Sequence, residues 1–277
     1  AKTDKETEDR VLGEIIDESY FVTGKDIKEL LDRLTDYSLY AFEDELRQGF
    51  ITIKGGHRVG LAGQAVLNGG RIMNLKNISF LNIRMAHQIV GCGMQVIPYI
   101  LCNGRLMDTL IISPPGCGKT TLLRDIVRII SDGNEYKQGM NVGIVDERSE
   151  IAGSYMGEPQ LDVGRKTDIL DACPKADGML MLLRSMNPEV IAVDEIGSRE
   201  DIDAINYVSN CGCGILATVH GESIDDIRTR PILRKLVEEK VFERYIVLSK
   251  RRGIGTVESV FDERGNELFY MDMCVAQ

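Results

Sequence analysis

Ser113-Pro114-Pro115-Gly116-Cys117-Gly118-Lys119-Thr120-Thr121 is the stretch of sequence that decides the fold of this chain. It follows the apolar run 110–112, which is typical of a buried strand, and it precedes apolar residues at helical spacing over 122–130. A strand, a glycine-rich turn, Lys-Thr and a helix together predict a phosphate-binding P-loop. Ser113 replaces the first glycine of the pattern, at the end of the strand, where another small residue is tolerated.

The residue types of this stretch suit the binding of a nucleoside triphosphate. Gly116 and Gly118 leave the backbone N–H groups free to surround a phosphate, because no Cβ stands in the way. The helix that follows adds the partial positive charge of its N-terminus. We expect the Lys119 ammonium to reach the β- and γ-phosphates and the Thr120 hydroxyl to bind Mg²⁺. The stretch 113–121 is therefore the predicted binding site for ATP with Mg²⁺.

A second motif ends an apolar strand, 190–193, in the two carboxylates of Asp194 and Glu195. In an open α/β sheet the carboxyl ends of the strands face the ligand. Asp194 is the expected second Mg²⁺ ligand, in the position of a Walker-B acid. Glu195 can then orient the attacking water and remove its proton. Such an internal base favours an ATPase over a Ras-type GTPase, whose Asn-Lys-x-Asp motif the sequence lacks.

Two further predicted strands end in polar residues at the same edge of the sheet. Asp146-Glu147-Arg148 follows the run 142–145, and its two acids are candidates to support Mg²⁺ through water. His220 lies two residues beyond the run 215–218. We expect His220 to hydrogen-bond the γ-phosphate or the water beside Glu195. The three histidines lack the paired spacing of metal ligands.

Phosphoryl transfer also needs a cation on the γ-phosphate, and an arginine is a common source. Arg84, Arg148 and Arg184 rank first among the candidates, ahead of Arg58 and Arg165. Arg84 belongs to the N-terminal part, so it can act only if that part folds over a nucleotide of its own chain or of a neighbour. Each of these arginines has the simpler alternative of a surface salt bridge.

The length, charge and cysteine content of the chain limit which classes of protein it can belong to. A chain of 277 residues is long enough for two domains. The formal net charge of −10 argues against tight, sequence-independent binding to a nucleic-acid backbone. No apolar run in the sequence is long enough to cross a bilayer. Seven scattered cysteines without a CxxC pair indicate reduced thiols in a cytosol.

The C-terminal part alternates predicted strands and helices. Apolar strands are expected at 109–112, 142–145, 190–193, 215–218 and 245–248, and helices at 119–131, 166–185, 201–211 and 224–239. This alternation predicts an α/β core with a mainly parallel sheet that helices cover on both faces. Two terminal segments, 256–261 and 267–270, are expected to form a hairpin.

The N-terminal part follows other patterns. A short amphipathic helix is expected at 11–16, and a helix pair over 26–46 that Asp26 and Glu29 cap at its start. From Phe50 the apolar period changes to two, and glycine turns at 55–56 and 68–70 predict an antiparallel sheet. We therefore predict a smaller α+β domain over 1–95, a linker over 96–105 and the α/β core over 106–277.

With these motifs in place, the chain resembles the secretion-type ATPases. The P-loop, the segment 146–148, Asp194-Glu195 and the segment 218–221 are similar to the Walker A, Asp box, Walker B and His box of that superfamily. The resemblance is strongest to its stage III sporulation protein AA family of endospore-forming bacteria, on stretches such as 49–60, 183–188 and 242–245. It covers about residues 25–270.

The resemblance implies a RecA-like core that hydrolyses ATP, with an N-terminal domain that swings against it. It implies a homo-oligomer, a hexameric ring, which docks on the cytoplasmic face of a membrane complex between mother cell and forespore, on the mother-cell side. No sequence-specific nucleic acid is expected as a partner. The family has more chain before the position of Ala1, so the N-terminal domain is expected to be truncated at its start.

Two alternatives stay open on the sequence. A nucleic-acid-dependent ATPase can use the same core, although the acidic balance counts against it and the segment 250–252 is its clearest basic cluster. A nucleotide-dependent scaffold with little turnover would carry the same binding motifs. Turnover and its response to DNA distinguish these alternatives from the motor.

Overall fold

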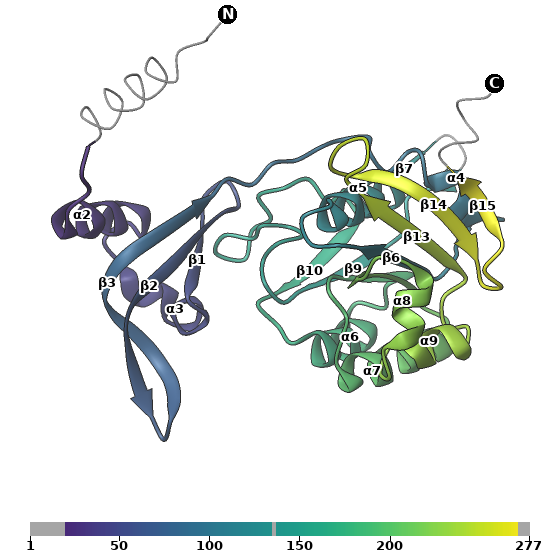
Figure 1. Ribbon diagram of the computed structural model, residues 1–277. Coiled ribbons are helices and arrows are strands. Elements are labelled where there is room, and N and C mark those ends of the chain that lie inside the picture. The colour runs from purple at the N-terminus through teal and green to yellow at the C-terminus, as the bar shows by residue number, and fades with distance from the viewer. Residues whose placement is uncertain (1–19, 135–136, 271–277) are drawn as a thin grey trace, which may run out of the picture. The chain divides into compact units, whose positions relative to one another are not determined.

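The computed structural model describes residues 20–134 and 137–270, and the helix expected at 11–16 lies outside them. The described chain separates into two compact units. The first unit comprises the residues up to Ile53 together with Arg58–Arg84, and the second comprises Lys54–His57 and the chain from Met85 onward. Figure 1 labels many of the helices and strands of both units.

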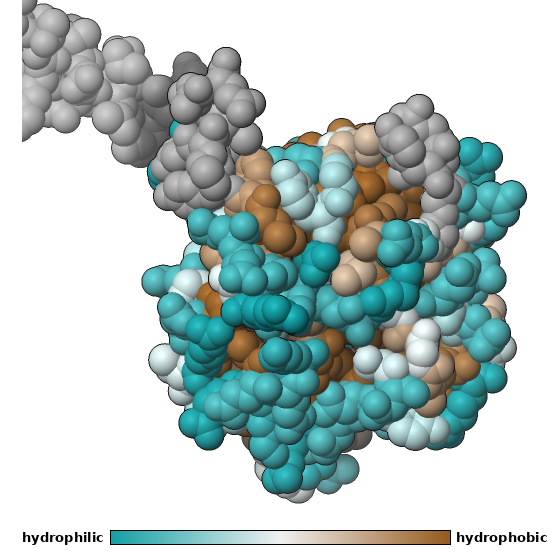
Figure 2. Space-filling model, turned by 90° about the vertical axis from the view of Figure 1, so that its right-hand side faces the viewer, coloured by the Kyte–Doolittle hydropathy of each residue, from teal (hydrophilic) through white to brown (hydrophobic). Residues whose placement is uncertain are grey.

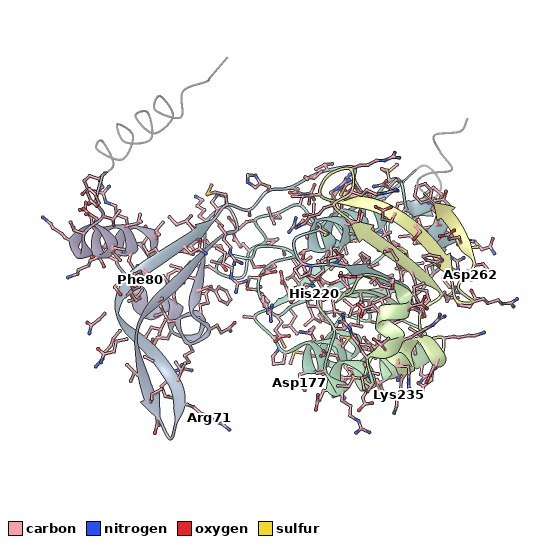
Figure 3. All side chains as sticks on the ribbon, in the orientation of Figure 1. Arg71, Phe80, Asp177, His220, Lys235 and Asp262 are labelled. Atoms are coloured by element: carbon pink, nitrogen blue, oxygen red, sulfur yellow. The ribbon has the colours of Figure 1, made fainter. Side chains whose placement is uncertain are left out.

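The first unit contains a three-stranded sheet in the order β1-β2-β3. Its elements are α2 Gly24–Leu34, a 3₁₀ turn at Leu39–Phe42, α3 Glu43–Gln48, β1 Phe50–Ile53, β2 His57–Asn68 and β3 Arg71–Arg84. β2 and β3 pair antiparallel in a long hairpin, with Arg71 beside its turn and Phe80 further along (Figure 3). The helix pair and the antiparallel sheet therefore match the predicted α+β pattern.

The start of α2 differs from the prediction in its capping residues. Thr23, one residue before the helix, exchanges two hydrogen bonds with Asp26, so that each side chain accepts from the other's backbone N–H. Glu29 pairs instead with Arg33 at 2.8 Å. The predicted cap of Asp26 with Glu29 was wrong because the helix begins two residues before Asp26.

The second unit is built on an eight-stranded sheet in the order β10-β9-β11-β12-β6-β13-β14-β15. Its strands are β6 Thr109–Ser113, β9 Val142–Asp146, β10 Thr167–Asp171, β11 Val190–Val193, β12 Gly214–His220, β13 Arg244–Ser249, β14 Thr256–Asp262 and β15 Glu267–Tyr270. Neighbouring strands from β10 to β13 pair in parallel, and β13, β14 and β15 pair antiparallel. The five predicted core strands and the terminal hairpin are confirmed.

Alternating side chains give this sheet two apolar faces. Ile111 of β6 packs into one core, and its neighbours Leu110 and Ile112 pack into the other. The helices that cover the first face are α4 Ile97–Ile100 and α5 Lys119–Asp132, and those that cover the second are α6 Lys175–Ser185, α7 Arg199–Asn210, α8 Ile224–Thr229 and α9 Arg234–Glu238 (Figure 1). The predicted α/β core with both faces covered is confirmed.

Two short ladders lie outside the main sheet. One joins β4 Leu101–Cys102 to β5 Arg105–Leu106, and the other joins β7 Gly133–Asn134 to β8 Lys137–Gln138. The first ladder belongs to the segment that the sequence predicted as a linker. Val96 and Ile100 in this segment are fully buried, so the segment is part of the second unit's core rather than a connection.

Two predicted helices have different bounds in the structure. Residues 167–171 of the helix expected at 166–185 form the edge strand β10 instead, and α6 starts only after Pro174, which is its N-cap residue. The helix expected at 224–239 is divided into α8 and α9, with Pro231 between them. Proline has no N–H to donate and clashes with the preceding turn, so the helix ends there.

The surface of the second unit around β14 and β15 is mostly hydrophilic, with smaller hydrophobic areas between the polar side chains (Figure 2). Among residues 20–134 and 137–270, no helix is long and apolar enough to span a bilayer. The longest described helix, α5, has 14 residues, whereas a span needs about 20 apolar ones.

Candidate nucleotide-binding site

The order of the parallel strands brings the predicted site residues of the second unit to one edge of the sheet. β6, which leads into the P-loop, lies between β12 and β13, and β11 lies on the far side of β12. In the strand register Ser113 at the end of β6 is opposite His220 at the end of β12. The carboxyl ends of β6, β11 and β12 therefore meet, and Figure 3 labels His220 among them.

The P-loop has the backbone that a phosphate cradle requires. Gly116 and Gly118 have φ angles of 68° and 89°, in the left-handed region that favours glycine. Gly118 is the N-cap of α5, and Lys119 is the first residue of this 14-residue helix. The N–H groups of the first helical turn therefore point out of the helix start, where an anion is stabilised.

The side chains of Lys119, Arg148 and His220 converge on the carboxylate of Glu195. The Lys119 Nζ lies 2.6 Å from Glu195 Oε1 and 3.8 Å from Asp194 Oδ1. The Arg148 Nη1 donates to Glu195 Oε2 at 2.8 Å, and the His220 Nε2 lies 3.0 Å from Oε1. The sequence predicted that Lys119 and Glu195 face the same crevice, and the structure places them in direct contact.

These contacts decide the charge state of Glu195. Burial raises the pKa of its carboxyl, but the hydrogen bond and charge of Lys119, together with the charges of His220 and Arg148, outweigh burial. The pKa of Glu195 therefore lies below its ordinary value. A carboxylate held in this way is a weak base, and any group that draws Lys119 away makes it a stronger one.

Asp194 is fixed by two hydroxyl groups. Thr120 Oγ1 donates to Asp194 Oδ2 at 2.5 Å, and Thr218 Oγ1 donates to Oδ1. Thr218 also accepts the N–H of Glu195 at 2.9 Å, and Glu195 has a left-handed φ of 55°. A backbone held in this sparsely populated region is typical of functional sites. Sequence reasoning gave Thr218 no role, although it is a single polar residue inside an apolar strand.

The Thr120 hydroxyl and the Asp194 carboxylate fit the chemistry of Mg²⁺. Both are hard oxygen donors, and Mg²⁺ keeps several ligands from water and substrate phosphates rather than from a closed protein cage. Within 20–134 and 137–270, no group of three or more His, Cys, Asp or Glu side chains forms a metal site of its own. The pair therefore suits a metal that arrives with a polyphosphate.

Asp146 and Glu147 line a small pocket that Arg148, Asp194 and Glu195 also line, and each of the two acids has partners of its own. Asp146 is 2% exposed, and its carboxylate accepts the N–H groups of Glu150, Ile151 and Ala152 at 2.8–2.9 Å. Glu147 pairs with a lysine at the start of α6. The water-mediated support of Mg²⁺ by these acids stays a prediction. Asp146 also shapes the loop that carries Arg148 to Glu195.

The stability of the protein is expected to depend on pH through Asp146. Burial raises the pKa of its carboxyl to about 6, more than the backbone hydrogen bonds lower it. The folded chain thus holds this proton more tightly than the unfolded chain does. Protonated Asp146 stabilises the folded state fully below about pH 4, and this contribution of about 3 kcal/mol is lost as the pH rises towards 6. Asparagine does not titrate, so Asp146→Asn lacks this pH-dependent loss. In urea titrations, the difference in unfolding free energy between Asp146→Asn and wild type should therefore move in favour of the variant as the pH rises from about 4 to about 6. Parallel pH curves for the two proteins would contradict the assignment.

Arg184 and Arg165, the other candidate arginines of the second unit, do not join the cluster around Glu195. Arg184 is exposed in the last turn of α6, which leads to the amino end of β11, at the opposite edge of the sheet from Glu195. Arg165 pairs with Asp132 at 3.5 Å. In the first unit Arg58 lies 3.5 Å above the Phe50 ring, and Arg84 is the last, exposed residue of β3. The roles of Arg84 and Arg184 stay predictions.

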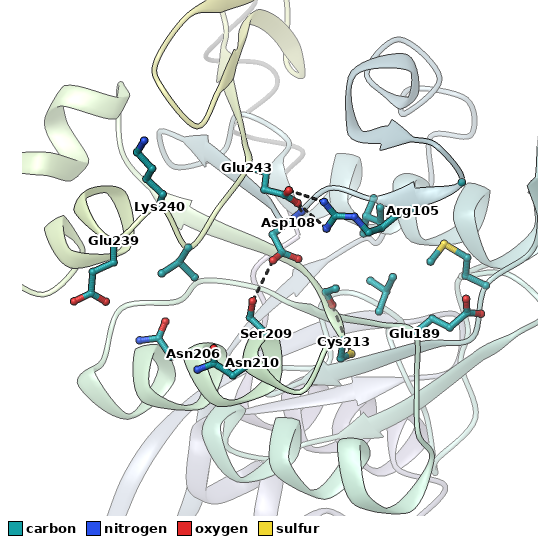
Figure 4. Close-up of a pocket in the computed structure, with 17 residues that line it drawn as sticks. Arg105, Asp108, Glu189, Asn206, Ser209, Asn210, Cys213, Glu239, Lys240 and Glu243 are labelled. Carbon is teal, nitrogen blue, oxygen red and sulfur yellow. Dashed lines mark hydrogen bonds and ion pairs between the residues drawn. The ribbon is translucent and has the colours of Figure 1, made fainter.

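A polar hollow of about 790 Å³ lies at the amino ends of β6, β11 and β12 (Figure 4). Its central charged groups have partners within the chain: Arg105 pairs with Glu243 at 2.6 Å, and Asp108 accepts the N–H of Ile215 at 2.8 Å. Burial raises the pKa of Asp108. This hollow is at the opposite edge of the sheet from Lys119, so it is not part of the nucleotide site.

Comparison with known proteins gives a family match over nearly the whole chain. The family model described as "Sporulation stage III, protein AA" matches residues 3–268. The stage III sporulation protein AA of Bacillus subtilis is 48% identical over 250 residues, which cover 90% of this chain and 81% of that protein.

The similar solved structures include two ATPases. The DotB ATPase of Legionella pneumophila has a TM-score of 0.54 at 16% identity, and DotB of Yersinia pseudotuberculosis has a TM-score of 0.54 at 14% identity. The matches cover 82% and 87% of this chain, and 65% and 69% of the two DotB chains. This chain thus spans about two thirds of their length. At such identities the likeness shows the fold, which is the predicted RecA-like core of secretion ATPases.

Proposed function

Since this chain belongs to the sporulation stage III protein AA family, we propose that it hydrolyses ATP as a ring-forming motor for a membrane complex of sporulation. One observation carries the proposal: Lys119, at the start of the P-loop helix, lies 2.6 Å from Glu195, the acid that follows β11, which is two places from β6 in the sheet. A phosphate-binding lysine and a candidate base are thus close enough to act on the two sides of one γ-phosphate.

The contact between these two residues gives binding a direct effect on the base. A triphosphate in the P-loop offers Lys119 several phosphate oxygens in place of one carboxylate oxygen. When the ammonium moves to the phosphates, the pKa of Glu195 rises, because Lys119 is the main group that lowers it. Binding of the substrate therefore prepares Glu195 to take a proton.

Hydrolysis then proceeds by in-line attack of water on the γ-phosphorus. Glu195 accepts a proton from the water, the bond from the γ-phosphorus to the β–γ bridging oxygen breaks, and Lys119 offsets the charge on the phosphates. Thr120 and Asp194 would hold Mg²⁺, which supplies further charge compensation when bound. His220 and Arg148 are positioning residues, since each contacts the Glu195 carboxylate and fixes its direction.

The proposed motor also requires other copies of this chain and a membrane complex to act on. We place the chain in a homo-oligomer, a hexameric ring, where Arg84 or Arg184 reaches the γ-phosphate of an adjacent protomer. The ring docks on the cytoplasmic side of a membrane-embedded sporulation complex, in the mother cell. The family membership supports this assignment, and so does the location of Arg184 away from its own chain's cluster.

Steady-state ATP turnover tests the function directly. We expect Mg²⁺-dependent release of phosphate that single-stranded DNA does not change at moderate salt, because the net charge of −10 opposes binding to a phosphate backbone. Stimulation by DNA would favour the nucleic-acid-dependent ATPase. Binding of ATP without turnover, in a preparation shown by light scattering to be a ring, would favour the scaffold.

A further inference from the structure

A loop of the second unit covers the P-loop on the side away from Glu195. It comprises residues 250–255 and connects β13 to β14. β13 pairs in parallel with β6, with Val247 opposite Ile112, so Lys250 leaves the sheet beside the start of the P-loop. The loop therefore begins at the edge of the sheet where the nucleotide is expected, and the proposed mechanism gives it no role.

Backbone contacts fasten this loop to the phosphate cradle. The Gly255 N–H donates to the Cys117 carbonyl at 3.0 Å. A Cβ built on Gly118 would lie 3.3 Å from the Gly255 Cα and 3.4 Å from the Ile254 Cγ2. At the other side of the turn Arg251 pairs with Glu258 of β14 at 3.0 Å. The loop is thus tied to both the P-loop and the sheet, and a residue at its tip has a defined place.

Lys250 directs its ammonium group to the P-loop backbone. A Cβ built on Gly116 would lie 3.3 Å from the Lys250 Nζ and 3.9 Å from its Cε. Among the residues that the structure describes, no carboxylate forms a salt bridge with Lys250, whereas Lys119 on the same cradle is neutralised by Glu195. An exposed cation without an acidic partner, next to backbone that is shaped for phosphate, is available to an anion from outside the chain.

The strand order tells which end of the nucleotide this cation faces. Asp194, Glu195 and His220 belong to β11 and β12, on one side of β6, and Lys250 follows β13, on the other side. The γ-phosphate has to lie near Glu195, so the phosphates closer to the nucleoside run towards the β13 side. Ile254, whose side chain is 72% exposed beside Gly118, offers an apolar surface at this end.

We propose that Lys250 is a second phosphate-binding lysine, which contacts the part of the polyphosphate next to the nucleoside, and that Ile254 packs against the nucleoside itself. The proposal rests on the proposed binding of ATP at the P-loop. The loop 250–255 then forms one wall of the nucleotide site, and its contacts are the same for a diphosphate and a triphosphate. Lys250 contributes to affinity, and the chemical step stays with Glu195.

Titration calorimetry of the full chain with three probes, Mg-ATP, Mg-ADP and Mg-pyrophosphate, tests the assignment of Lys250. We expect Lys250→Gln to weaken all three by a similar factor of about 10–100, since one charge-assisted hydrogen bond is lost. The turnover number at saturating ATP should stay within about twofold of wild type while KM rises, because Lys250 does not touch the reacting water. Lys235→Gln, an exposed lysine of α9 well separated from His220 in Figure 3, is the matched control.

Ile254→Ser separates the nucleoside contact from the phosphate contact. It should weaken ADP severalfold and leave pyrophosphate unchanged. If Lys250→Gln binds all three probes as tightly as Lys235→Gln does, the inference is overturned while the proposed function stands. A selective loss of ATP over ADP in Lys250→Gln would also overturn it, because the cation would then face the γ-phosphate. If the wild-type chain takes up none of the probes, the proposed function fails together with it.

Discussion

Lys119→Ala is expected to abolish ATP binding, with a rise in Kd of at least about a hundredfold and no measurable turnover. Lys119 is 8% exposed and lies between Glu195, at 2.6 Å, and Asp194, at 3.8 Å. Without its ammonium the phosphate cradle loses its central cation and keeps two carboxylates that repel a polyphosphate. The lost attraction to Lys119 and the remaining repulsion by the two carboxylates both lower the affinity for ATP.

The control for this variant is Lys235→Ala, which removes the same charge from the exposed surface of α9. Its ATP affinity and turnover should match those of wild type. Circular dichroism and the urea midpoint establish that Lys119→Ala is folded before its affinity is interpreted. A folded Lys119→Ala chain that binds Mg-ATP normally would show that the nucleotide does not use this P-loop, and the proposed function would fail.

Glu195→Gln is expected to separate binding from chemistry. Turnover should fall by about 10²–10⁴-fold, which is the contribution of a positioned general base. ATP affinity should stay the same or increase severalfold, because a neutral amide no longer competes with the phosphates for the Lys119 ammonium. Single-turnover rates and equilibrium binding of Mg-ATP measure the two effects separately.

The matched control is Glu239→Gln, an exposed carboxylate just after α9, at the edge of the sheet opposite the site. It should change neither affinity nor rate. An unaffected turnover in Glu195→Gln refutes the base assignment even if binding is normal. Loss of affinity and rate together would instead indicate that Glu195 maintains the shape of the P-loop.

The sequence predicted the core of the fold and the central pair of the site for a specific reason. The motifs stand where parallel strands end, and parallel strands end at one edge. Once the run 190–193 is recognised as a parallel strand of the same sheet, Glu195 is expected at the same edge of the sheet as Lys119. The spacing of apolar residues after the P-loop likewise predicted a helix over 119–131, and α5 covers Lys119–Asp132.

The remaining features depend on contacts that local patterns do not encode. Residues 167–171 have no helix-breaking glycine, and only pairing with β9 makes them a strand. Arg184 was a candidate from the sequence, but its place at the opposite edge of the sheet from Glu195 follows from the direction of α6. Thr218 and Lys250 become functional candidates only when the neighbours of β6 are known. Thr218 belongs to β12, on one side of β6, and Lys250 follows β13, on the other side.

The exposed Ile254 beside the helix start has a practical consequence. The chain contains no tryptophan, so an Ile254→Trp variant would carry a single indole next to Gly118. Excited at wavelengths that the nine tyrosines do not absorb, its emission would report the arrival and departure of unlabelled nucleotides in real time.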